Sequence, residues 1–279
     1  MKKLLTVALL LVVVLGLSAC GDKPTAKNRL EAIKERGYIQ VVSEPYFVPF
    51  EFIDSTKTGD DKYVGVDVEI AKVIAEKLGV ELRFIPLEFS AVLAGVTEGK
   101  YDVALSALAH TPVREEALNL SEGYYYGSND GYGMLIRAKD KDRFNSLESL
   151  SDAVVVAQSG SLQEGYVNGQ IPKYKEFKRV SATTDGMLMI AEGKADACAV
   201  AVANANLYIQ ANPDADLMIM EGFAFTIDPK TQGTRAAMPK GEDELTEFVN
   251  GVLKELLESG QIEKWYTEYT QYAVSLGVK

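Results

Sequence analysis

The stretch YDVALSALAHTPVREEALNLSEGYYY, from Tyr101 to Tyr126, carries the clearest structural signals in the chain. It opens with the apolar run Val103 to Leu105, which fits a buried strand, and then reaches Thr111-Pro112. A threonine side chain caps free backbone N–H groups at a helix start, and a proline at the first helical position lacks only a donor that would have no partner there. The stretch therefore predicts a strand followed directly by a helix.

Arg114 falls in the first turn of that helix, where the helix dipole disfavours a cation by roughly 0.3 to 1 kcal/mol. A compensating interaction is therefore expected. In the functional interpretation, Arg114 points back over the strand end and holds an anion, most naturally a carboxylate bound through two parallel hydrogen bonds. In the alternative, it is a surface arginine paired with Glu115 or Glu116, since exposed ion pairs are common.

The N-terminal region has the features of an export signal. Two lysines and an apolar run from Leu4 to Leu17 precede Cys20, and the run is too short and too early for a membrane-spanning stop-transfer helix. The pattern resembles a bacterial lipoprotein signal, in which residues 1–19 are removed and Cys20 is acylated. A secretory signal cleaved near Ala19 is the alternative. Residues 20–27 are polar and suit a tether from the lipid, anchoring the protein at the extracytoplasmic face of the membrane.

Charge and cysteine content narrow the possible partners. Removing Lys2 and Lys3 with the signal takes the formal charge from −11 to −13, so a nucleic-acid partner is not expected. With Cys20 lipidated, Cys198 has no cysteine partner and lies in an apolar run, which predicts a buried small hydrophobe. No metal site or cofactor is expected, and stability must come from burial of an apolar core.

Apolar and amphipathic runs alternate nearly throughout, which favours an α/β fold with parallel strands joined by helices. One set of runs fills residues 28–131 and a second fills 132–226, which predicts two lobes. Residues 227–279 are expected to return to the first lobe and to close the chain with two helices. The expected helices are 28–36, 67–77, 90–98, 161–167, 184–192 (capped by Asp185), 203–210, 242–258 and 261–272; the expected strands are 39–42, 80–86, 103–105, 133–137, 153–157, 176–180, 196–200 and 217–220.

Ligands of open α/β sheets bind outside the carboxyl ends of the strands, and two facing lobes bring two such ends together. Arg114 occupies that position in the first lobe. In the second lobe, strand 153–157 leads into Gly160-Ser161-Leu162 and a helix. The backbone N–H groups of Ser161 and Leu162 would offer an anion site there, although a plain helix cap is the alternative. A carboxylate held between Arg114 and this turn would draw the lobes together.

Seven motifs now show a resemblance to a known family. They are the lipobox, VPFEF, KYVGVDVEIAKVIAEKLGV, EGKYDVALSALAHTPVREEALNLSEGYYY, VVVAQSGSLQEGY, AEGKADACAV and MPKGEDEL. Their order and spacing resemble those of the family 3 extracellular solute-binding proteins of amino-acid ABC importers, which include glutamine-binding protein. The resemblance implies the type II periplasmic-binding-protein fold, with two hinge crossings near Ser128–Gly133 and Thr226–Thr234. It also implies closure around a ligand, an ABC permease as partner and action as a monomer.

The resemblance also assigns binding residues. It places the family's carboxylate-binding arginine at Arg114 and its Gly-Thr turn at Gly160-Ser161-Leu162. There the Ser161 hydroxyl and the Leu162 N–H would donate further hydrogen bonds to the ligand's carboxylate. It places aromatic walls at Phe47 and Phe89, with Tyr46 beside them, although Phe89 would equally suit the core under the following helix.

Two positions depart from the family pattern. The family has an aspartate for the ligand's α-ammonium where this chain has Ala201, and usually a threonine where it has Ala109. An enclosed ammonium without a partner costs at least ~1 to 3 kcal/mol, so ordinary amino acids should bind tenfold to a hundredfold or more weakly. Backbone carbonyls around Ser106 and Ala107, or the side chain of Glu44, would restore part of this interaction.

We therefore expect a lipid-anchored protein that captures a small carboxylate, aromatic or apolar in character, and delivers it to a permease. The first alternative is binding of a conventional amino acid through rearranged polar groups. The second is a dehydratase-like enzyme with Glu44 as general acid, but no histidine or second acid is visibly paired with it, so no catalytic residue is assigned. His110 is interpreted as a solvated loop residue, with a pH switch or ligand contact as the alternative.

Overall fold

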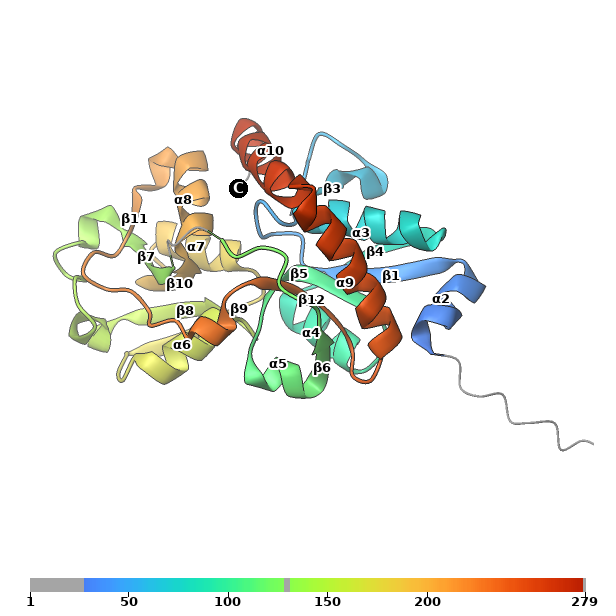
Figure 1. Ribbon diagram of the computed structural model, residues 1–279. Helices are drawn as coiled ribbons and strands as arrows, with labels where there is room; N and C mark the ends of the chain where they lie inside the picture. The colour runs from blue at the N-terminus through green and yellow to red at the C-terminus, as the bar shows by residue number, and fades with distance from the viewer. Residues whose placement is uncertain (1–27, 128–130, 278–279) are drawn as a thin grey trace, which may run out of the picture.

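Two five-stranded sheets, each covered by helices, form the two lobes that lie side by side in Figure 1. The computed structural model describes residues 28–127 and 131–277. In the first lobe the strand order is β4 (Glu81–Pro86), β1 (Tyr38–Ser43), β5 (Val103–Ala109), β12 (Thr234–Pro239) and β6 (Leu118–Leu120). In the second lobe it is β11 (Leu217–Ile219), β7 (Tyr132–Arg137), β10 (Ala197–Ala201), β8 (Val154–Gln158) and β9 (Glu176–Val180). A separate hairpin pairs β2 (Phe52–Ile53) with β3 (Tyr63–Val64) and was not anticipated.

The helices divide between the lobes in the same way. The first lobe carries α2 (Arg29–Arg36), α3 (Val66–Leu78), α4 (Phe89–Thr97), α5 (Pro112–Ala117), α9 (Asp243–Glu258) and α10 (Gln261–Leu276). The second carries α6 (Leu162–Gln170), α7 (Thr183–Ala191) and α8 (Val202–Ala211). Short 3-10 turns occupy η1 (Gly59–Lys62), η2 (Ala138–Asp140), η3 (Glu148–Asp152), η4 (Pro213–Ala215) and η5 (Pro229–Thr231). The expected α/β fold is confirmed.

The expectation of parallel strands joined by helices holds for part of each sheet, and the remaining strands are antiparallel. β1 pairs in parallel with β4 and β5, and β8 does so with β9 and β10. By contrast, β12 is antiparallel to β5 and β6, and β7 is antiparallel to β10 and β11. The physical reason is that β7 and β12 enter their sheets from the other lobe and not through a helical crossover.

The chain passes between the lobes twice, after β6 and before β12 (Figure 1). The two passages are hydrogen-bonded to each other: the Tyr124 N–H donates to the Thr234 carbonyl (2.9 Å), and the Thr234 N–H donates to the Tyr125 carbonyl (2.7 Å). Two adjacent strands of this kind can bend together and so suit a hinge. Of the expected crossing at Ser128–Gly133, residues 128–130 lie outside the described residues.

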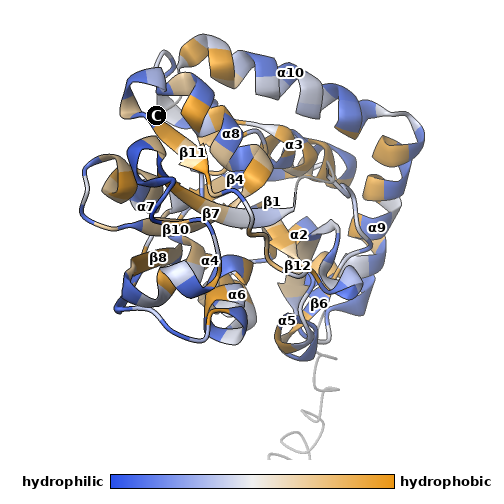
Figure 2. Ribbon diagram, turned by 90° about the vertical axis from the view of Figure 1, so that its left-hand side faces the viewer, coloured by the Kyte–Doolittle hydropathy of each residue, from blue (hydrophilic) through white to orange (hydrophobic). Residues whose placement is uncertain are grey.

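The core of the first lobe lies on both faces of its sheet. Alternate residues of β1 point to opposite faces, so Val41 packs in the cluster with α3 and α9 while Val42 packs in the cluster with α4. Figure 2 shows β12 in apolar colours, whereas the outer helices α9 and α10 carry both apolar and polar residues. On α9 the buried residues recur every three or four positions, as an amphipathic helix requires: Leu245, Val249, Val252, Leu253 and Leu256.

Local capping fixes several helix starts near the cleft. The Thr111 hydroxyl accepts from the Arg114 N–H (3.2 Å) at the start of α5, as predicted. The Ser161 hydroxyl accepts in the same way from the Glu164 N–H (3.1 Å) at the start of α6. Asp185 does not cap α7: Ala182 occupies the cap position and Asp185 lies in the first turn. The expected helix is confirmed to within one residue at each end, and only the assignment of Asp185 as its cap is wrong.

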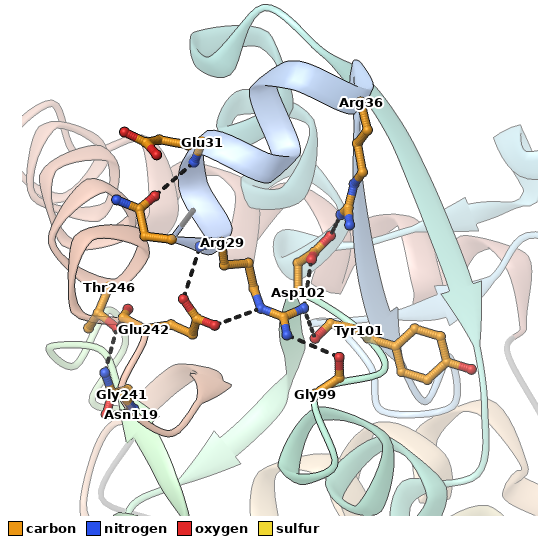
Figure 3. Close-up of polar contacts among 11 residues, drawn as sticks. Arg29, Glu31, Arg36, Gly99, Tyr101, Asp102, Asn119, Gly241, Glu242 and Thr246 are labelled. Atoms are coloured by element: carbon orange, nitrogen blue, oxygen red, sulfur yellow. Dashed lines mark hydrogen bonds and ion pairs between the residues drawn. The ribbon is translucent and has the colours of Figure 1, made fainter. Parts of the chain in front are cut away.

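A buried ion-pair network fixes the first helix to the rest of its lobe (Figure 3). Asp102, which is fully buried, accepts from Arg29 Nη1 (3.0 Å) and from the Gln40 N–H (2.8 Å), and it pairs with Arg36. Arg29 Nε also donates to Glu242 Oε1 (3.2 Å) just before α9. The first helix is therefore connected within its lobe both to the start of β5 and to the start of α9.

Residues 1–27, which include the expected signal, the tether and the lipidation site Cys20, lie outside the described residues. Over 28–127 and 131–277, the structure contains no helix with the length and apolar character needed to cross a membrane.

Candidate functional site

Arg114 lies in the space between the two lobes. The turn from β5 into α5 carries its side chain back over the strand end, where Nη1 donates to the Ala109 carbonyl (2.7 Å). Nη2 crosses to the second lobe and donates to the Gly160 carbonyl (3.0 Å). The guanidinium carbon lies 5.5 Å from the centroid of the Phe89 ring. The alternative of a surface arginine paired with Glu115 or Glu116 is wrong, because the residue is only 8% exposed.

The charge of Arg114 is not balanced by any acidic side chain in the part of the chain that the structure describes, since both of its hydrogen bonds go to carbonyl oxygens. Burial lowers the pKa of the guanidinium to about 10, which still leaves it charged at neutral pH. A buried cation without a counter-ion is costly. Such a group is therefore suited to receive an anion from outside the chain.

The second lobe contributes the turn between β8 and α6. Gly160 adopts φ +75°, a conformation that favours glycine, and a Cβ built on it would lie 3.4 Å from Leu93 of the first lobe. The Ser161 hydroxyl donates to the Gln158 carbonyl (2.7 Å) while it caps α6, so its proton is already used. The Leu162 N–H, at the first helical position, has no acceptor within the helix and is available to a ligand.

A cavity of about 40 Å³ adjoins Arg114, and we refer to it as the cleft cavity. It is lined by both lobes: Glu44, Phe47, Phe89, Ser106, Ala107, Ala109, Arg114, Tyr132, Gln158, Ser161, Leu162 and Gln163. Nine of these were singled out from the sequence, and Tyr132, Gln158 and Gln163 were not. At roughly 10 to 15 Å³ per water, this volume admits only a few water molecules. A larger ligand therefore requires the lobes to separate further before they close on it.

Two residues expected at the site lie elsewhere. Tyr46 is 46% exposed and lines a different cavity, of about 360 Å³, near the end of α10. That larger cavity has no charged residue among those that line it, so it offers nothing to an anion. Ala201 lines a neighbouring cavity of about 230 Å³. Phe89 is 7% exposed and packs in the core, as one interpretation expected, and it also lines the cleft cavity; its role as a wall for a ligand stays a prediction.

Glu44 is the acidic side chain of the cleft cavity. It is 2% exposed, and its Oε1 has no hydrogen-bond partner among the described residues. Burial raises the pKa of the Glu44 carboxyl to about 8; a hydrogen bond with Gln158 opposes this rise and the charge of Asp185 adds to it. At neutral pH the ligand-free cleft therefore holds mainly a protonated carboxyl, opposite a charged guanidinium.

Two further buried acids, Asp67 and Glu51, accept hydrogen bonds from residues that line the cleft cavity. Asp67 accepts from the Ala107 N–H (2.8 Å) and from the Tyr124 hydroxyl (2.7 Å). Glu51 accepts from the Ser106 hydroxyl (3.4 Å), which in turn accepts from the Glu44 N–H (3.0 Å). Burial raises the pKa of Asp67 to about 6 and that of Glu51 well above its ordinary value.

Asp67 also explains an unusual backbone conformation. Ala107 adopts φ +47°, which is rare for a residue other than glycine, and its N–H is turned towards Asp67 and away from the cleft. The sequence pattern placed Asp67 at the start of an amphipathic helix and gave no sign of this role.

Groups typical of other chemistries are absent from the cleft. Within the described ranges, no three His, Cys, Asp or Glu side chains gather as metal ligands. His110 lies outside the cleft lining, with its Nε2 3.0 Å from Glu115 Oε2. Cys198 is fully buried, and burial raises the pKa of its thiol to about 12, so its predicted role as a small hydrophobe is confirmed.

Comparisons with known proteins agree with this architecture. The sequence profile of the bacterial extracellular solute-binding proteins, family 3, matches residues 39–272. The arginine-binding extracellular protein ArtP of Bacillus subtilis (strain 168) is 30% identical over 276 residues, which cover 96% of this chain and 99% of ArtP. The cyclohexadienyl dehydratase of Pseudomonas aeruginosa is 24% identical over 205 residues, covering 72% of each chain.

A solved structure shares the whole arrangement. The amino acid ABC transporter substrate-binding protein AbpA from Streptococcus pneumoniae, bound to L-arginine, superposes with a TM-score of 0.76 at 29% identity and covers 89% of this chain and 99% of its own. The chain therefore belongs to the family 3 bacterial extracellular solute-binding proteins and has the type II periplasmic-binding-protein fold.

Proposed function

We propose that this chain is the lipid-anchored binding component of an ABC importer and that it captures a small carboxylate of aromatic or apolar character by closure of its lobes. The observation that carries the proposal is Arg114, a buried cation that contacts both lobes and has no anionic partner among the described residues. Acylation of Cys20 would hold the protein at the outer face of the membrane, next to its permease. Replacement of Cys20 by serine should release the protein from the membrane fraction.

Closure follows from the position of the guanidinium. A ligand carboxylate accepting from Arg114 in the first lobe would also reach the Leu162 N–H in the second. Both sets of contacts exist only when the lobes are together, so the ligand favours the closed form by its difference in affinity for the two forms. The residues around Arg114 thus bind and orient the anion, and the hinge converts that binding into a change of shape that a permease can recognise.

The α-ammonium of an ordinary amino acid finds little support in the cleft. Ala109 and Ala201 offer no polar side chain, and the single acid that lines the cleft cavity, Glu44, is mainly protonated at neutral pH. An enclosed ammonium without a partner would cost at least ~1 to 3 kcal/mol. A carboxylate without an α-amino group avoids this cost.

A conventional amino acid is the second candidate, and the free Oε1 of Glu44 favours it. A cationic ligand would lower the pKa of Glu44 and could pair with the resulting carboxylate. ArtP and AbpA, as their names state, bind arginine. An enzyme is not proposed, because neither a histidine nor a second acid joins Glu44 in the cleft lining.

The test is a thermal-shift screen against amino acids, their deaminated keto and aryl-acid analogues, and amines. A ligand at 100 times its dissociation constant should add about 2.7 kcal/mol to the free energy of unfolding. Under the proposal, carboxylates without an α-amino group produce the shift and Arg114→Met abolishes it. Tight binding of an amino acid that survives Arg114→Met would overturn the proposal, and product analysis of the hits would reveal turnover.

A further inference from the structure

The cleft cavity borders a second, larger cavity. This neighbouring cavity has a volume of about 230 Å³, and we refer to it as the aromatic chamber. It shares Phe47, Ala107, Ala109 and Tyr132 with the lining of the cleft cavity. Two of these four shared residues are alanines, so small side chains form part of the boundary between the two cavities. A ligand held at Arg114 would cross this boundary to reach the chamber.

Aromatic rings dominate the chamber. Tyr125 and Tyr266 stack with their ring centroids 4.3 Å apart, and Phe50 meets their edges at 5.3 and 5.6 Å. Phe47 lies beside Phe50, with centroids 6.3 Å apart. Among the described residues that line the chamber, 127 and 131 included but 128–130 not, there is no lysine, arginine, aspartate or glutamate. The chamber thus favours an uncharged, flat group that can pack against the rings.

One side chain that lines both the chamber and the cavity near the end of α10 carries a buried acceptor without a partner among the described residues. Asn204 is 7% exposed; its Nδ2 donates to the Val48 carbonyl (3.1 Å), and its Oδ1 has no partner among the described residues. Asn204 comes from the second lobe and Val48 from the first, so this acceptor is held in place only when the lobes are closed.

We infer that the aromatic chamber is a ligand subsite that receives the uncharged aryl tail of a carboxylate whose head is bound by Arg114. This inference rests on the proposed function and names its substrate class as aryl-substituted short-chain acids. The chamber is large enough, because an apolar cavity of about 150 Å³ admits benzene. A carboxylate with a positively charged tail finds no anion among the described residues that line the chamber.

The experiment titrates the full mature chain with phenylacetate, 3-phenylpropionate and 4-phenylbutyrate by calorimetry. Each methylene that brings the ring further into the chamber should tighten binding about fourfold until the chamber is filled. L-Phenylalanine should bind at least tenfold more weakly than 3-phenylpropionate, which differs from it only in lacking the amino group. A trimethylammonium carboxylate of similar length tests whether the rings select a cation instead.

Two variants test whether the aryl tail lies in the chamber. Ala109→Leu adds volume where the two cavities meet, and Ala201→Leu adds volume in the chamber itself. Each should weaken 4-phenylbutyrate binding at least tenfold. Ala94→Leu, on the exposed side of α4, is the matched control and should change the affinity less than twofold. Urea denaturation of each variant separates lost binding from lost folding.

The outcomes separate the inference from the proposed function. Aryl acids that bind with no loss in either leucine variant, or a trimethylammonium carboxylate that binds more tightly, would overturn the chamber assignment alone. Arg114-dependent binding of some other carboxylate, with no response to the aryl series, would do the same. If no carboxylate binds, or if binding survives Arg114→Met, both the inference and the proposed function fail.

Discussion

Replacing Arg114 by methionine should separate binding from folding. Methionine keeps much of the side-chain volume while removing the charge and all of the donors. Arg114 is 8% exposed, and burial lowers the pKa of its guanidinium from 12.5 to about 10. At 1.36 kcal/mol per pKa unit, holding the charge in the ligand-free cleft costs roughly 3 kcal/mol.

The substitution removes that cost and also removes two hydrogen bonds, to the carbonyls of Ala109 and Gly160. Hydrogen bonds from a charged donor contribute about 1.5 to 3 kcal/mol each. The two effects largely cancel, so the free energy of unfolding of the ligand-free variant should fall by no more than about 3 kcal/mol relative to the parent. The affinity for a carboxylate should fall without any such compensation, because the variant leaves the bound anion without its charged partner. Loss of such a partner typically costs 2 to 5 kcal/mol of binding free energy, or about thirtyfold to a few thousandfold in affinity.

The assay is urea denaturation of parent and variant with and without a saturating carboxylate from the screen. Arg83→Met is the control, since Arg83 is exposed and its pair with Glu81 (3.1 Å) should contribute at most about 1 kcal/mol. A fall of more than 4 kcal/mol in the ligand-free Arg114→Met protein, combined with an unchanged ligand-induced shift, would mean that Arg114 is a structural residue.

Three further predictions concern the buried acids. Because the folded-state pKa of Glu44 is raised from 4.5 to about 8, the stability associated with its protonated form is present below pH 4.5 and is lost as pH rises through 8. The stability advantage of Glu44→Gln over the ligand-free parent should therefore grow between pH 5 and 8 by up to roughly 4 kcal/mol, measured by urea denaturation; a constant difference would contradict the assigned cause. Tyr124→Phe leaves Asp67 without one donor and should lower the free energy of unfolding by about 1 to 3 kcal/mol, whereas no change would mean that the 2.7 Å contact contributes nothing. Asp102→Asn weakens the pairs with Arg29 and Arg36 and should cost about 3 kcal/mol at low salt; a thermal midpoint equal to that of the parent would show the network to be dispensable.

The sequence predicted those features whose cause is local. Thr111 and Pro112 mark the start of α5 within a few residues, and the same short turn determines the direction in which Arg114 points. Glycines end α2 and α3, as the sequence indicated, because they adopt left-handed backbone conformations easily. Boundaries of this kind depend on neighbouring residues and need no knowledge of the rest of the fold.

Features that depend on contacts between distant segments were missed. The apolar runs of β7 and β12 indicate strands but carry no information about direction, which is set by the passages between the lobes. Tyr132, Gln158 and Gln163 reach the cleft only because the lobes meet. Asp67 looks like an ordinary first-turn acid until Tyr124, 57 residues further along the chain, is brought against it.

The contacts of Asp67 connect the first-lobe part of the site to the hinge. Asp67 connects Ala107 of the cleft lining to Tyr124, and the Tyr124 N–H is bonded to Thr234 in the second passage between the lobes. The cleft floor of the first lobe and the start of the hinge therefore belong to one hydrogen-bonded unit.

A unit of this kind should move as one body when the lobes open and close. Arg114, which follows the same strand end, would then keep its position in both forms, while the turn at Gly160 approaches and retreats with the second lobe. The affinity of the open form would be set by Arg114 and its neighbours alone. Substitutions in the Gly160 turn should consequently change the dissociation rate of a bound carboxylate more than its association rate, because they act after the first contact has formed.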